Sequence, residues 1–348
     1  MMAGRLISML TLLSLLASSL PAAAQQGSLE GALWQDYKSR FLEASGRIVD
    51  NANGGISHSE GQGYGLLLAF YANSQSDFEQ IWSFTKTELM IRDDGLTAWK
   101  WDPAAQPHVT DVNNASDGDL LIAYALAMAG AAWEREDYLL SAAALAQAIL
   151  DNVVVDRGGR VLLLPAAEGF DAGERPDGPV INPSYWIFEA FPVMAILAPS
   201  DRWSKLQQDG IALLETMTFG PRNLPAEWVS LARQSKPAEG FAAEFGYNAI
   251  RIPLYLLRAS DEHLDLVRRL LQGMTIDDVP SIVDLSSGEA KERLEDPGYR
   301  FVNHILACVG EGRTVPSAAR ELTSELYYPA TLHLLGLAFI VEKHPSCL

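Results

Sequence analysis

The sequence predicts an all-α protein in which helical hairpins are wound into a barrel. Nearly every segment with a clear hydrophobic pattern has apolar residues at the spacing of one helix face, and strand-like alternation is rare. Polar loops of similar character precede expected helices at Glu60, Asp117, Ser184 and Asn248. Their spacing of about sixty residues is the length that two helices up and two helices down fill with their loops. We therefore expect these loops to meet at one end of the barrel.

The helical pattern can be followed in order along the chain. The expected helices are 62–72, 77–90, 118–129, 138–152, 185–197, 201–219, 249–258, 262–274 and 329–342. Ser76 has the character of an N-cap for the second of them. One β-hairpin is expected outside the helical scaffold, with strands at 153–155 and 161–164 and a turn between them at Gly158 and Gly159.

The first 24 residues have the pattern of a secretory signal. Arg5 supplies a positive charge, 6–20 form a short apolar run, and 22–24 are the small residues that a signal peptidase requires. The run is too short to span a bilayer comfortably, and no later stretch is apolar enough to do so. We expect a signal peptide at 1–24, one domain at 25–348, no membrane span after signal removal, and a secreted or periplasmic location.

The charge balance restricts the partners of this chain. A formal net charge of −18 disfavours nucleic acid, anionic lipid and anionic polysaccharide, because an acidic surface repels them. A neutral or cationic substrate is compatible with this charge. Cys308 and Cys347 would both enter an oxidising compartment, where they either form a disulfide or remain two unpaired thiols.

Carboxylates stand at the starts of two expected helices. Glu60 lies in a glycine-rich loop directly before an apolar helix, where the backbone can turn sharply and a ligand can come close. It is a candidate acid or base, although a helix-start glutamate favoured by the helix dipole has the same pattern. Asp117 and Asp119 open another helix, and capping explains only one of the two.

Aromatic residues are concentrated in the same kind of loop. Trp99, Trp101 and Tyr185 do not lie at helical core spacing. Indole and phenol rings can stack on the C–H faces of sugar rings, so several such platforms in an open cleft suit an oligosaccharide. The alternative is that these side chains plug the mouth of the barrel.

The fourth loop places Tyr247, Asn248 and Arg251 at a helix start. Arg251 either pairs with a carboxylate of the mouth, which would lower the pKa of that carboxylate, or anchors Glu244. Spacings typical of zinc ligands, phosphate-binding loops and nucleophile elbows are missing from the sequence, so we expect no cofactor and no metal.

Five motifs together resemble glycoside hydrolase family 8 and occur in the order of that family. They are SEGQGYG at 59–65, WKWDP at 99–103, ASDGD at 115–119, NPSYW at 182–186 and FGYNAIRIPLY at 245–255. The resemblance implies an (α/α)6 barrel, a single catalytic domain and an inverting mechanism. It is most similar to bacterial endo-β-1,4-glucanases that accompany cellulose synthase, which implies a β-glucan or cello-oligosaccharide as substrate and a monomer acting beside a cellulose synthase complex.

The resemblance also assigns residues. The glutamate of the first motif, here Glu60, corresponds to the general acid of the family, and Asp117 to the residue that holds the sugar and water. Substrate-cleft positions correspond to Trp99, Trp101, Asp119, Ser184, Tyr185, Tyr247 and Arg251.

The sequence departs from the family at Asn248. Well-studied members have an aspartate there as general base, whereas an amide is neutral and too weakly basic to take a proton from water. Our hypothesis is that Asp117 acts as base while Asn248 orients the water, with Asp119 and Glu244 as less favoured candidates. Chitosanase or xylanase activity stays open as an alternative function, as does a catalytically weak glucan-binding component of cellulose export.

Overall fold

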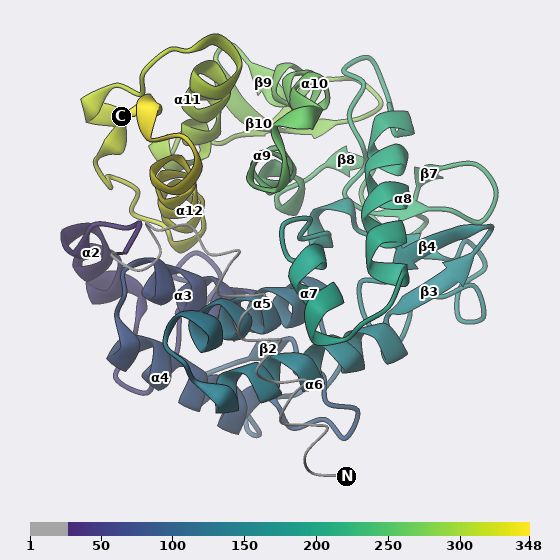
Figure 1. Ribbon diagram of the computed structural model, residues 1–348. Helices are drawn as coiled ribbons and strands as arrows, with labels where there is room; N and C mark the ends of the chain where they lie inside the picture. Colours follow the sequence, from purple (N-terminus) through teal and green to yellow (C-terminus); the bar gives the residue numbers. More distant parts are fainter. Residues whose placement is uncertain (1–26) are drawn as a thin grey trace. The chain divides into compact units, whose positions relative to one another are not determined.

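The computed structural model describes residues 27–348, so the expected signal peptide at 1–24 lies outside the described residues. The described chain divides into two compact units. The first holds the described residues up to Asp151 together with Ala190–Trp203, and the second holds Asn152–Glu189 and Ser204–Leu348. Helices dominate both units (Figure 1). In the described part, no helix has the length and the apolar character that crossing a membrane requires.

The first unit is built around a pair of deeply buried helices. Its helices are α2 (Gly31–Phe41), α3 (Ser59–Tyr71), α4 (Gln75–Phe84), α5 (Ser116–Ala132), α6 (Glu136–Asn152) and α7 (Phe191–Leu197), and a short ribbon pairs β1 (Ser57–His58) with β2 (Lys100–Trp101). The helices α3 and α5 lie side by side (Figure 1) and are buried almost all around. Gly63 allows this close approach, because a Cβ atom at this position would lie only 2.5 Å from the Cβ atom of Leu121.

The second unit combines helices with short strands. Its helices are α8 (Arg202–Thr216), α9 (Ile252–Ala259), α10 (Leu264–Met274), α11 (Pro297–Glu311) and α12 (Tyr327–Lys343). Its strands are β3 (Val154–Arg157), β4 (Arg160–Leu163), β5 (Val180–Ile181), β6 (Val229–Ser230), β7 (Lys236–Pro237), β8 (Glu244–Phe245), β9 (Thr275–Ile276), β10 (Val279–Asp284) and β11 (Ala290–Arg293). The predicted hairpin is confirmed as β3 and β4, and the sheets β5-β6-β7 and β11-β10-β8 are additional to the prediction.

A disulfide and a buried ion pair stabilise the second unit. Cys308 of α11 is bonded to Cys347 near the end of the chain, which decides between the two alternatives left open by the sequence. Arg258 of α9 lies 2.6 Å from Glu189 and also donates to the carbonyl oxygen of Leu335 in α12. Both charges are almost fully buried, so the pair ties α9 to two other segments of the chain.

Two helix predictions need correction. The expected helix at 185–197 is only a 3₁₀ turn at Pro183–Tyr185 followed by α7, because Pro192 is compatible with a helix only in its first turn. Ser76 is not an N-cap, since α4 begins at Gln75 and its N-cap is Ser74. The helices α2 and α11 were not predicted.

Candidate active site

The first two predicted loops meet within the first unit. Glu60 lies in the first turn of α3, where the preceding His58 is the N-cap and accepts a hydrogen bond from the backbone N–H of Gly61 at 3.0 Å. Asp117 lies in the first turn of α5. A Cβ atom on Gly118 would lie only 2.7 Å from the backbone nitrogen of Glu60, so the two helix starts are in contact. The backbone segments that carry Glu60 and Asp117 therefore lie side by side.

His58 belongs to this acidic cluster, although we did not single it out from the sequence. Its Nε2 atom lies 3.5 Å from Asp50 Oδ2. Burial alone would lower the pKa of His58, but the hydrogen bond with Asp50 and the charges of Glu60 and Asp117 outweigh burial and raise it. The carboxylates near the starts of α3 and α5 therefore act on the pKa of His58 more strongly than its burial does.

Asp119 is buried, and its carboxylate binds the loop that precedes Trp99. Its Oδ1 atom accepts hydrogen bonds from the backbone N–H and the hydroxyl of Thr97 at 2.8 and 2.7 Å, and its Oδ2 atom accepts one from Asn114 Nδ2 at 2.8 Å. Burial, with a smaller contribution from the charge of Asp117, raises the pKa of Asp119 to about 6. These bonds fix the segment that leads to Trp99.

Replacing Asp119 by Asn should flatten the dependence of stability on pH. Because its folded-state pKa is about 6 and therefore above the unfolded value, the stability that protonated Asp119 contributes is complete below about pH 4 and is lost as the pH rises through 6. This loss is on the order of 2–3 kcal/mol. The amide of the variant keeps an acceptor for Thr97 and does not titrate. Urea unfolding at several pH values between 4 and 7 measures the change, and an equally steep decline in the variant would contradict the assignment.

The two tryptophans of the second motif lie in different surroundings. Trp99 is beside Glu60, because its backbone oxygen accepts the N–H of Ser59 at 2.9 Å. Trp101 pairs with Ser57 across the ribbon, whereas His58 pairs with Lys100, so Trp101 and His58 face opposite sides of the ribbon.

Trp101 lines a pocket of about 500 Å³. The guanidinium carbon of Arg47 lies 4.9 Å from the centre of the Trp101 ring, and the centre of the His108 ring lies 4.2 Å from it. The indole N–H of Trp101 donates to Glu88. The backbones of Trp99 and Trp101 thus both contact the chain at the start of α3 or just before it, and the ring of Trp101 lies at this pocket.

The third and fourth predicted loops meet within the second unit. Arg251 is fully buried, donates from Nε to the backbone oxygen of Ser184 at 3.1 Å, and lies 5.6 Å from the ring centre of Tyr185. Tyr247 is hydrogen-bonded to the hydroxyl of Tyr299. These loops therefore supply a compact cluster of one cation and several phenol rings.

Glu244 does not need Arg251 as an anchor. Its carboxylate forms an ion pair with Lys291 of β11. Burial raises the pKa of Glu227, and the charge of Arg251 makes only a small contribution in the opposite direction.

Glu227 is a candidate functional residue that was not predicted from the sequence. Its Oε1 atom accepts a hydrogen bond from Asn248 Nδ2 at 2.9 Å, and its Oε2 atom accepts one from the backbone N–H of Asn248 at 3.2 Å. Burial raises the pKa of Glu227 above its ordinary value, and the hydrogen bonds from Asn248 partly offset this. A carboxylate beside a tryptophan in a proline-containing loop, with no helix to cap, was the available signal.

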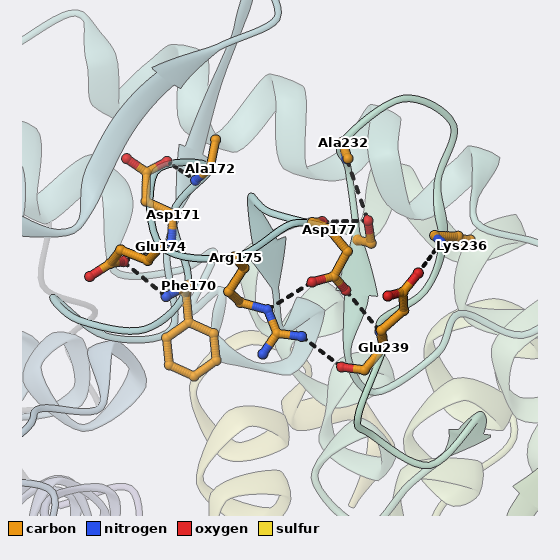
Figure 2. Close-up of polar contacts among 10 residues, drawn as sticks. Phe170, Asp171, Ala172, Glu174, Arg175, Asp177, Ala232, Lys236 and Glu239 are labelled. Atoms are coloured by element: carbon orange, nitrogen blue, oxygen red, sulfur yellow. Dashed lines mark hydrogen bonds and ion pairs between the residues drawn. The ribbon is translucent and has the colours of Figure 1, made fainter.

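Aromatic stacking holds the loop that carries Glu227. The ring of the next residue, Trp228, is nearly parallel to those of Phe170 and Phe241, at centroid distances of 5.5 and 4.5 Å. Arg175 lies over Phe241 and, as Figure 2 shows, donates to Asp177 and to the backbone oxygen of Glu239. The position of Glu227 is thus supported by a packed and hydrogen-bonded surround.

Asp177 links three segments in this surround. One of its carboxylate oxygens accepts from Arg175 at 2.9 Å, and the other accepts from the backbone N–H of Glu239 at 2.8 Å (Figure 2). Its backbone oxygen accepts from the hydroxyl of Ser230 in β6. Asp177 therefore fixes the chain between β6 and β8 at Ser230 and at Glu239.

Comparison with known proteins identifies the family. Residues 4–341 match the model of glycosyl hydrolases family 8. A probable endoglucanase of Novacetimonas hansenii is 36% identical over 310 residues, which cover 87% of this chain and 88% of the relative.

An endoglucanase of family 8 from Klebsiella pneumoniae is 34% identical, with a TM-score of 0.80 over 90% of this chain and all of the other. An endo-β-1,4-glucanase from Acetobacter xylinum is also 34% identical, with a TM-score of 0.79 over 93% of this chain and 99% of the other. These likenesses confirm the predicted (α/α)6 fold class. The chain belongs to glycosyl hydrolases family 8 and is a glycoside hydrolase.

Proposed function

We propose that this protein is an inverting endo-β-1,4-glucanase that hydrolyses internal bonds of cellulose or a related neutral β-glucan. The observation that carries the proposal is the contact between the starts of α3 and α5, which brings Glu60 and Asp117 into one acidic cluster. Relatives across nearly the whole chain are named endoglucanases, which supports this substrate class. The net charge of −18 is compatible with a neutral polysaccharide.

Glu60 acts as general acid in this proposal. In its protonated form it gives a proton to the glycosidic oxygen as the bond to the anomeric carbon breaks. A water molecule attacks the anomeric carbon from the opposite face, so the configuration at that carbon inverts. Asp117 holds the sugar and the water, and Trp99 offers a ring on which a sugar unit stacks.

The first test is the stereochemistry and substrate range of hydrolysis. Purified protein is incubated with hydroxyethylcellulose, which is neutral, and with lichenan, chitosan and xylan, while reducing ends and viscosity are followed. We expect reducing ends on the two glucans, with a fall in viscosity that precedes extensive release, because internal bonds are cut. Proton NMR of cello-oligosaccharide hydrolysis should show the α-anomer first.

Each alternative gives a different result in the same assay. A β-anomer as first product would contradict the inverting mechanism. Product from chitosan or xylan alone would assign the protein to another activity of the family. Binding of cello-oligosaccharides without any product after long incubation would identify a glucan-binding component instead.

The cellular setting follows from the sequence and is part of the proposal. The pattern at 1–24 supports export, and the family resemblance supports a monomer that acts beside a cellulose synthase complex in the periplasm or outside the cell. Fractionation of cells that express the full chain tests the location, and recovery only in the cytosol would contradict it.

A further inference from the structure

A histidine caps the helix that carries Glu60. A helix cap needs a side-chain acceptor for an N–H of the first turn, and serine, threonine, aspartate or asparagine usually provides it. At the start of α3, Nδ1 of His58 accepts a hydrogen bond from the backbone N–H of Gly61 at 3.0 Å. Glu60 lies between these two residues, so this hydrogen bond closes the turn from which the side chain of Glu60 projects.

The contacts of His58 define its tautomer. A ring nitrogen can accept a hydrogen bond only when it carries no proton of its own, so the proton of the neutral ring lies on Nε2. Nε2 is 3.5 Å from Oδ2 of Asp50. At this distance the carboxylate acts on the ring mainly through its charge, which favours a proton on the nitrogen that faces it. Asp50 therefore stabilises the tautomer that can cap α3.

Asp50 is itself held in place by the turn that precedes β1. Its Oδ1 atom accepts a hydrogen bond from the backbone N–H of Ala52 at 3.0 Å, and its backbone N–H donates to the carbonyl oxygen of Ile56 at 2.9 Å. Only 15% of the surface of each of the two side chains, His58 and Asp50, is exposed. The pair is thus largely shielded from water, which strengthens the effect of one charge on the other.

The cap exists only while His58 is neutral. A doubly protonated imidazole carries an N–H group on both nitrogens and cannot accept from Gly61. The charged groups that act on the ring belong to the turn before β1, to α3 and to α5, and they are Asp50, Glu60 and Asp117. Across the ribbon, Lys100 pairs with His58, and its ammonium lies 5.1 Å from the ring centre of Trp99.

These carboxylates favour the protonated form of His58. Together they outweigh burial and raise the pKa of His58 above its ordinary value. His58 therefore gains its second proton at a higher pH than an ordinary histidine does. A serine or asparagine at this position would keep the cap at every pH, because neither side chain titrates in this range.

We propose that His58, oriented by Asp50, is a positioning residue for Glu60 and that it acts only in its neutral form. This rests on the proposed function. By capping α3, neutral His58 fixes the first turn and with it the direction from which Glu60 gives its proton to the glycosidic oxygen. A second proton on His58 removes the cap, so hydrolysis of glucan should slow as the pH falls through the pKa of His58.

Two substitutions separate the cap from the titration. In His58→Asn, the side-chain oxygen can still accept from Gly61 and gains no proton. We expect kcat on β-1,4-glucan to stay close to that of the wild type above neutral pH and to lack the decline on the acidic side that follows the pKa of His58. His58→Ala has no acceptor, so kcat should be roughly tenfold lower at every pH with little change in KM.

The leaving group shows whether His58 acts through Glu60. A phenol that leaves without protonation needs no acid, so His58→Ala should hydrolyse an aryl cellobioside at the wild-type rate while its rate on glucan falls. A general loss of structure would lower both rates. In a Glu60→Gln background, His58→Ala should reduce kcat on glucan no further, because no acid remains to be positioned.

NMR spectroscopy observes the tautomer independently of activity. Proton–nitrogen spectra of protein with isotope-labelled histidine show which ring nitrogen carries a proton, and the signal lost in His58→Asn identifies His58. We expect the proton on Nε2 at high pH. In Asp50→Asn, the amide oxygen keeps the contact with Ala52 and the NH₂ group faces Nε2. The proton should then move to Nδ1, and kcat on glucan should fall as in His58→Ala.

His344 provides the matched control. Its Nε2 atom also faces a carboxylate, at 3.3 Å from Asp261, but it lies at the end of α12. His344→Asn should keep wild-type kinetics and the wild-type pH profile.

The outcomes are distinct. An unchanged acidic side in His58→Asn, equal losses on both substrates in His58→Ala, or a proton on Nδ1 of wild-type His58 at high pH would overturn the proposal. If the wild-type protein releases no sugar from any β-glucan, the proposed function fails, which is a different result from an altered pH profile or tautomer.

Discussion

Replacing Glu60 by Gln should lower kcat on soluble β-1,4-glucan by about 10²–10⁴-fold. The amide keeps the size of the side chain but cannot donate a proton to the leaving oxygen. Since sugar alkoxides are poor leaving groups, the loss should be large for glucan and small for an aryl cellobioside whose phenol leaves without protonation. Initial rates on both substrates, with KM measured for each, separate loss of the acid from loss of binding.

A matched control tests whether Glu60 only favours the start of its helix. Glu136 is also a first-turn glutamate, at the exposed start of α6 in the same unit. Either substitution removes a favourable interaction with the helix dipole, worth about 0.3–1 kcal/mol. Glu136→Gln should keep full activity. If Glu60→Gln also keeps it, Glu60 is a helix-start residue and the acid lies elsewhere.

Removing the disulfide should lower the free energy of unfolding by about 4 kcal/mol. Cys308 and Cys347 are 39 residues apart, so the bond restricts a long loop of the unfolded chain. It also ties the last 3₁₀ turn to α11. Urea unfolding of the Cys308→Ser, Cys347→Ser double variant, compared with the oxidised protein, measures the effect.

The reduced wild-type protein provides the control for this measurement. It should match the double variant in stability, because both lack the bond and differ only in sulfur against oxygen. Neither cysteine belongs to the proposed site, so kcat at low temperature should be unchanged. Equal stability of the oxidised and reduced proteins would contradict a constraint of this size.

The helices that were predicted best are those whose pattern is local. The positions of α3 and α5 follow from apolar spacing and from carboxylates at their starts, and Glu60 and Asp117 were found for the same reason. The segment 185–197 failed because apolar residues at helical spacing also occur in buried irregular chain, and Pro192 limits the helix to its end. Local pattern cannot distinguish these two cases.

The contacts that escaped prediction join residues that are far apart in the sequence. Asp119 acts through Thr97, 22 positions away, and Glu227 through Asn248, 21 positions away. The direction in which Trp101 faces depends on the pairing of β1 with β2. None of these relations leaves a periodic signal in the sequence, so motifs located the loops but not the partners within them.

Because Gly118 has no side chain, the two helix starts of the acidic cluster lie close together, and the distance between them can change little. Because α5 touches the backbone of Glu60 at this point, the separation between the first turns of α3 and α5 is determined by helix packing. A packed helix pair resists length changes, whereas loops accept insertions. Efforts to broaden the range of accepted polysaccharides should therefore vary 102–110, and should leave 59–63 and 116–121 untouched.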